Sequence, residues 1–207
     1  MNDVIARYEF RVFAPQLDKT GELLRTMASC DSASESREVY LLDCEAMPSS
    51  NVKIRNDRLE QKQLIRLYHG LERWKPAGQW EFPVSPETIR QLWSYDVLKE
   101  APIKSAALSR EQLLQLVEEN VRLYRADVFK RRYRFSLMGC AAELIRMEVD
   151  GQAFESCAVE SGDPQAVLAV LDALQLEDDL NRSYPRMLCQ VVTGNSDDRR
   201  DKYVSRN

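Results

Sequence analysis

The sequence is poor in histidine, which limits histidine-based chemistry. It contains a single histidine, His69, among 207 residues. A histidine-ligated metal site or a serine–histidine triad therefore has almost no basis. Because His69 precedes Gly70 in an expected loop, a solvated side chain is the simpler interpretation.

Long apolar runs and paired cysteine motifs are also absent. No stretch approaches the roughly 18 apolar residues that a membrane span needs, and the N-terminus lacks the apolar core of a signal peptide. We therefore expect a cytoplasmic protein. The five cysteines, at positions 30, 44, 140, 157 and 189, form no Cys-x-x-Cys pair or metal-like spacing. We expect them to be reduced and mostly buried.

Composition favours one folded domain. The chain is 44% hydrophobic and 30% charged, with a net charge of −4, so it can build a substantial core. We expect this domain to cover residues 1–192 and a flexible polar tail to cover residues 193–207. The overall acidity argues against a broad nucleic-acid surface, although it leaves a bound RNA 5′ end open.

Short alternating segments predict a large antiparallel sheet, and capping residues predict helices. Serine or aspartate followed by a periodic apolar run, in three cases with proline, predicts helices that begin after Ser85, Ser109, Asp163 and Ser183. Strands are expected at 4–13, 37–44, 51–56, 59–67, 79–84, 127–137, 142–150 and 155–161. The fold class is therefore α+β.

Charge segregates by strand face. In RYEFRVF (7–13), apolar side chains alternate with Arg7, Glu9 and Arg11, and the same alternation recurs in later strands. If these polar faces meet inside a curved sheet, four carboxylates, Glu9, Glu60, Glu148 and Glu160, face inward. They are joined by nine cations: Arg7, Arg11, Lys53, Arg55, Lys62, Lys130, Arg132, Arg134 and Arg146.

An excess of clustered cations favours a multivalent anion such as an oligophosphate. Arginine and lysine both suit phosphate oxygens, and the carboxylates could hold Mg²⁺ or Mn²⁺. For any single strand, an ordinary solvated face explains the alternation equally well.

The order of these segments resembles the CYTH superfamily of triphosphate tunnel metalloenzymes. RYEFR is similar to the first strand of the family, SREVYLLDC to the second, VKIR to the third and LEQKQL to the fourth. FKRRYRF, ELIRMEVDG, CAVES and LNRSYPRML resemble the later motifs in order. The resemblance covers about residues 4–190. It implies an antiparallel eight-stranded tunnel, a closed or cupped barrel, with helices packed outside.

The same resemblance implies roles for the charged residues. The nine cations would bind the phosphates, and Glu9, Glu148 and Glu160 would be the catalytic and metal-binding carboxylates. Arg7 and Ala158 stand where the family has glutamates, and Glu148 stands where it has aspartate. The changes at Arg7 and Ala158 remove metal ligands, whereas Glu148 keeps a carboxylate on a longer side chain.

Two classes of function follow from the resemblance. One is a metal-dependent hydrolase of inorganic tripolyphosphate, a nucleoside triphosphate or thiamine triphosphate. The other is a non-catalytic module that binds a nucleotide, polyphosphate or phosphorylated partner. An RNA 5′-triphosphatase is a third interpretation, and adenylate cyclisation has less support because no base pocket is identifiable. The tryptophan-containing region 68–108 suits a lid or partner surface, or ordinary packing.

Overall fold

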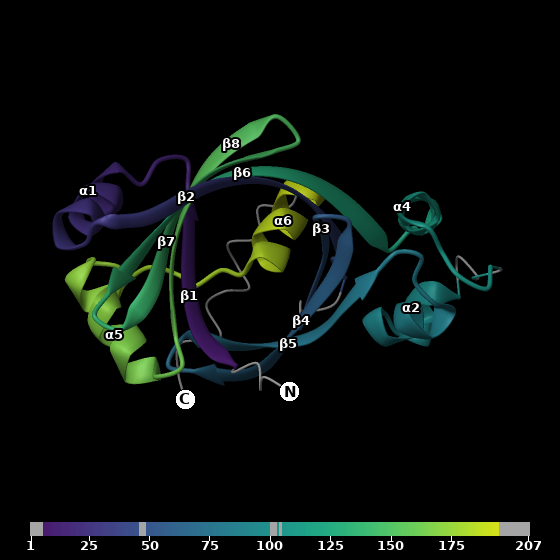
Figure 1. The fold of residues 1–207 in the computed structure, drawn as a ribbon, viewed down its shortest axis with the longest axis horizontal. Helices are drawn as coiled ribbons and strands as arrows, with labels where there is room; N and C mark the ends of the chain where they lie inside the picture. The colour runs from purple at the N-terminus through teal and green to yellow at the C-terminus, as the bar shows by residue number, and fades with distance from the viewer. Residues whose placement is uncertain (1–5, 46–48, 100–102, 104, 195–207) are drawn as a thin grey trace.

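A computed structural model describes residues 6–45, 49–99, 103 and 105–194. Eight antiparallel strands close into a barrel in the order β1-β5-β4-β3-β2-β6-β7-β8 (Figure 1). The strands are β1 (Arg7–Ala14), β2 (Cys30–Asp43), β3 (Ser50–Arg55), β4 (Arg58–Tyr68), β5 (Leu71–Glu81), β6 (Leu123–Leu137), β7 (Cys140–Val149) and β8 (Gln152–Ser161). The predicted eight-stranded tunnel and its α+β class are confirmed. Most of the expected tail lies outside the described residues.

The helices are α1 (Asp18–Met27), α2 (Pro86–Leu92), α3 (Tyr95–Leu98), α4 (Arg110–Glu119), α5 (Pro164–Ala173) and α6 (Tyr184–Thr193). The four predicted helix starts are correct. The Ser85 hydroxyl accepts a hydrogen bond from the Thr88 amide at 3.2 Å, and Ser109 forms a capping box with Gln112. Such caps satisfy amides that the first turn leaves without partners.

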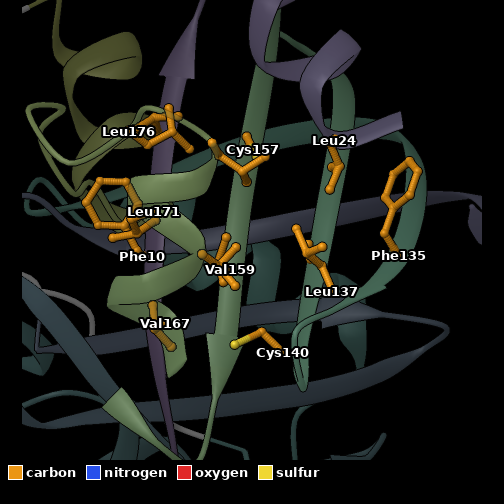
Figure 2. Packing of buried hydrophobic residues seen from close by; sticks show 14 of the residues in the cluster. Phe10, Leu24, Phe135, Leu137, Cys140, Cys157, Val159, Val167, Leu171 and Leu176 are labelled. Atoms are coloured by element: carbon orange, nitrogen blue, oxygen red, sulfur yellow. The ribbon is translucent and has the colours of Figure 1, made fainter. Parts of the chain in front are cut away.

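Two apolar clusters cover the outside of the barrel. In the first, α1 and α5 pack on outward-facing residues of β1, β6, β7 and β8, among them Phe10 and Val159 (Figure 2). In the second, α2, α3 and α4 pack on β2, β3 and β4. Trp93 belongs to this second cluster. Part of the 68–108 region is therefore ordinary core.

Helix α6 occupies a different position, within the ring of strands (Figure 1). Its residues Tyr184, Met187 and Leu188 form a third cluster with side chains of β2, β6 and β7. On β7 these side chains are Ile145, Met147 and Val149. The interior thus has an apolar part filled by α6 and a polar part beside it.

A disulfide between Cys44 and Cys189 joins the end of β2 to α6. The expectation that all five cysteines are reduced is therefore wrong for this pair, whereas Cys30, Cys140 and Cys157 are free. Burial raises the pKa of the Cys157 thiol to about 12, so this thiol is unreactive. Disulfides are typical of oxidising compartments. The cytoplasmic location stays a prediction.

Three local expectations need adjustment. β5 begins at Leu71, whereas the strand was expected at 79–84. β2 begins at Cys30, before the expected 37, and helices α1 and α3 were not expected. None of the described helices has the length and apolar character needed to cross a membrane.

The disulfide yields a stability prediction. It closes a loop of 145 residues, so Cys189→Ser should lower the free energy of unfolding by about 2–4 kcal/mol through gained entropy of the unfolded chain. Urea unfolding without reductant measures this change. Cys30→Ser, which alters a free and exposed thiol, is the control and should leave the midpoint unchanged. Equal midpoints for the wild type and Cys189→Ser would contradict the prediction.

Candidate functional site

The polar part of the interior is a small cavity rich in cations. Its volume is about 170 Å³. Seven of the nine predicted phosphate-binding residues line it: Arg11, Lys53, Arg55, Lys62, Lys130, Arg132 and Arg134. Alternation along β6 explains the last three, because every second side chain of that strand points into the barrel. Their role in binding phosphate stays a prediction.

Arg7 lies at the edge of the site. Its guanidinium forms an ion pair with Glu160, with an Nη1–Oε1 distance of 2.8 Å, and its side chain is 53% exposed. Glu160 lines the cavity. Arg7, which stands where the resemblance implies a glutamate, therefore pairs with Glu160, one of the three predicted metal ligands.

Strand β7 corrects two of the predicted positions. Arg146 and Glu148 are exposed on the outer face, where Arg146 pairs with Glu155 at 3.0 Å. The intervening apolar residues point inward because α6 fills that part of the barrel. Glu148 and Arg146 therefore do not face the cavity, and β7 supplies Glu143 in their place.

Glu38 on β2, which the sequence analysis did not single out, is the most enclosed carboxylate of the site. Its side chain is 0% exposed. The carboxylate lies 2.9 Å from Lys130 Nζ and 3.0 Å from Lys53 Nζ. Arg132 Nη2 is 3.4 Å away and Arg55 Nη1 is 3.8 Å away. One carboxylate thus has four cations around it.

Tyr40 links Glu38 to Lys130. The Tyr40 hydroxyl donates to Glu38 at 2.9 Å and accepts from Lys130 at 2.7 Å. Although burial alone would raise it, the pKa of Glu38 lies well below its usual range because Lys130 and Lys53 stabilise the anion. Burial lowers the pKa of Lys130, and Glu38 only partly offsets this effect.

The remaining inward carboxylates are each paired with arginine. Glu9 accepts from Arg11 Nε at 2.9 Å, and Glu60 accepts from Arg55 Nη2 at 3.0 Å. Glu143 lies 3.4 Å from Nε of both Arg132 and Arg134. Burial acts to raise the pKa of Glu9, but Arg11 and Lys62 lower it below its usual value. Each of these carboxylates therefore has a guanidinium group beside it.

This arrangement does not suit a divalent metal. Among the described residues, no three histidine, cysteine, aspartate or glutamate side chains lie close enough to hold a metal ion. Glu9 is bound to Arg11, Glu160 to Arg7, and Glu148 faces outward. Mg²⁺ usually takes one or two carboxylates together with waters and substrate phosphates. The guanidinium groups beside Glu9 and Glu160 disfavour a cation there, so the residues present fit the predicted metal site poorly.

Two side chains of the cavity carry hydrogen-bond donors that have no partner among the described residues. No hydrogen bond or ion pair joins Lys62 to another described residue, and Lys62 is exposed at the cavity. The Tyr184 hydroxyl is buried and has no hydrogen-bond partner within the described part of the chain. The Tyr184 ring lies 3.5 Å from Lys130 Nζ. Both side chains could donate to a bound anion.

Comparisons with known proteins found similar folds among solved structures and no similar family or curated sequence. No family model matches the chain, and no curated protein matches it. HpAC1 from Hippeastrum, described as a putative adenylyl cyclase with a dominant triphosphatase activity, is 14% identical, with a TM-score of 0.52; the match covers 91% of this chain and 96% of HpAC1.

The PH1819 protein of Pyrococcus horikoshii is 15% identical, with a TM-score of 0.50; the match covers 89% of this chain and 99% of PH1819. At such identities the likeness concerns the fold alone.

The two buried tyrosines provide a matched test of the site. Tyr40→Phe should lower the free energy of unfolding by about 1–3 kcal/mol, because Lys130 and Glu38 lose a buried hydrogen-bond partner. Tyr184→Phe should leave stability nearly unchanged, because its hydroxyl bonds to nothing described and its ring remains. Denaturant unfolding of both variants checks the contrast. Equal losses of stability would contradict this description of the site.

Proposed function

We propose that this chain, which has a divergent CYTH-like tunnel fold, binds a small phosphate-bearing anion without metal-dependent hydrolysis. This is the binding-module interpretation of the sequence. The observation that carries it is the pairing of Arg7 and Arg11 with Glu160 and Glu9, the carboxylates on which a metal would depend. The cations of the site remain, but two of the predicted metal ligands each have an arginine bonded to one oxygen.

Charge supports an anionic ligand. Seven cations and four glutamates line the cavity, so positive charge is in excess. Unpaired like charges in a confined site repel one another, and an anion that enters relieves the repulsion. Lys62 and the half-exposed Arg134 are the cations with the greatest freedom to contact it.

Hydrolysis of a triphosphate is the second candidate function, and the likeness of fold to HpAC1 favours it. A metal ion would have to orient the phosphates and activate water. In this chain, Arg7 and Arg11 each bond to one oxygen of Glu160 and Glu9, so a metal ion at either carboxylate would lie beside a guanidinium cation. That positive charge disfavours a metal ion and favours an anion.

The binding proposal predicts tight, metal-independent association with pyrophosphate in EDTA. Arg132→Ala should weaken binding about 10- to 100-fold, because a charge-assisted hydrogen bond is worth about 1.5–3 kcal/mol. Arg131→Ala is the matched control, since Arg131 is adjacent on β6, faces outward and pairs with Glu35 at 2.7 Å. Isothermal titration calorimetry measures all three proteins. Equal affinities for the two variants would contradict a role for the inward face.

A second prediction concerns the missing metal ligands. Mn²⁺ should bind weakly to the wild type, whereas the Arg7→Glu, Ala158→Glu double variant should gain affinity of at least tenfold. The inward position of Ala158, which pairs with Arg11 on β1 and Glu143 on β7, makes this substitution informative. Electron paramagnetic resonance of free Mn²⁺ provides the measurement. Tight Mn²⁺ binding by the wild type, with phosphate release from tripolyphosphate, would favour the hydrolase.

A further inference from the structure

The buried carboxylate of Glu38 lies among cations that also line the cavity. Its two oxygens receive hydrogen bonds from Lys53 and Lys130 and lie near Arg55 and Arg132. Four of the seven cations that line the cavity are therefore already turned toward an internal anion. A phosphate group that enters has to share these cations with Glu38.

We infer that Glu38 is a built-in counter-anion that limits the ligand to a short phosphate group, a diphosphate at most, and so discriminates against triphosphate chains. This inference rests on the proposed anion-binding function. It goes beyond that function by naming the ligand class and the residue that sets it.

The charge of the site supports this limit. Around the cavity, counting Arg7, Glu38 and the Arg186–Glu72 pair beside Glu9, nine cations face six carboxylates, which leaves a net charge of +3. A phosphate monoester carries a charge of about −2 at neutral pH, and each further phosphate group adds roughly one more. A diphosphate therefore balances the site, and a longer chain brings uncompensated negative charge close to Glu38.

The size of the cavity supports the same limit. Its volume of about 170 Å³ is smaller than the ~300–1,000 Å³ typical of small-molecule pockets. On the β7 side the interior is filled by Ile145 and Met147, which pack with α6. An extended triphosphate could not gain room in that direction without displacing buried apolar side chains.

The test is a selectivity ratio, measured by calorimetry in EDTA at fixed ionic strength. Wild-type protein should bind pyrophosphate at least as tightly as tripolyphosphate. Glu38→Gln, which removes one negative charge with little change of shape, should reverse this order and favour tripolyphosphate by about tenfold or more. Glu38→Asp keeps the charge and should retain the wild-type order. Glu35→Gln, exposed on the same strand, is the control and should also retain it.

The outcomes distinguish the role of Glu38 from the proposed anion-binding function. An unchanged ratio in Glu38→Gln overturns the role of Glu38 while leaving the proposed function intact. If the wild type binds neither anion but Glu38→Gln binds tripolyphosphate, Glu38 is the limiting anion and the proposed function fails. If neither protein binds either anion, both claims fail.

Loss of Glu38 leaves buried cations unbalanced, so Glu38→Gln could unfold. In that case circular dichroism replaces calorimetry as the measurement. Tripolyphosphate should then restore the folded spectrum at a lower concentration than pyrophosphate, because it supplies more of the missing charge. Failure of both anions to restore the spectrum, or restoration by pyrophosphate at the lower concentration, would overturn the inference.

Discussion

The interaction on which the polar interior depends is the contact of Glu38 with the cations of β3 and β6. Lys130 is almost fully buried, and a lysine in that position is stable as a cation only with an anion beside it. Glu38 supplies that anion at 2.9 Å, and Tyr40 bonds to both groups. The cations of β3 and β6 can therefore lie close together without a bound ligand.

The other inward carboxylates are also paired with cations of the barrel. Each inward carboxylate lies beside an arginine, and in the β1 region Arg7 and Arg11 pair with two of the predicted metal ligands, Glu160 and Glu9. On the opposite side of this polar network, α6 and its disulfide to β2 close the apolar part of the barrel. The fold thus divides one interior into an apolar part, which supplies stability, and a small charged cavity, which we propose as the anion-binding site. The likeness to solved structures concerns this architecture, and the identity of the ligand depends on the side chains of this chain alone.

Much of the fold was predictable because alternation and capping are local signals. Period-two patterns located most strands, and Ser85, Ser109 and Asp163 marked helix starts. Alternation cannot say which face is inside, however. It succeeded for β6, whose basic residues point inward, and failed for β7, whose apolar residues point inward to meet α6.

The Cys44–Cys189 pair joins residues 145 positions apart, which spacing cannot reveal. Glu38 and Tyr40 are two positions apart on β2, so their side chains lie on the same face of the strand. This shared face was the one sequence signal that could have placed Glu38 inside the barrel.

The central claim is that the cavity binds a short phosphate anion and does not hydrolyse it with a metal. The most direct test is ³¹P nuclear magnetic resonance of pyrophosphate mixed with the protein, first in EDTA and then with excess Mg²⁺. We expect a shifted or broadened pyrophosphate resonance in EDTA and no growth of an orthophosphate resonance after Mg²⁺ is added. A sharp, unshifted pyrophosphate resonance in EDTA, or orthophosphate that accumulates once Mg²⁺ is present, would contradict it.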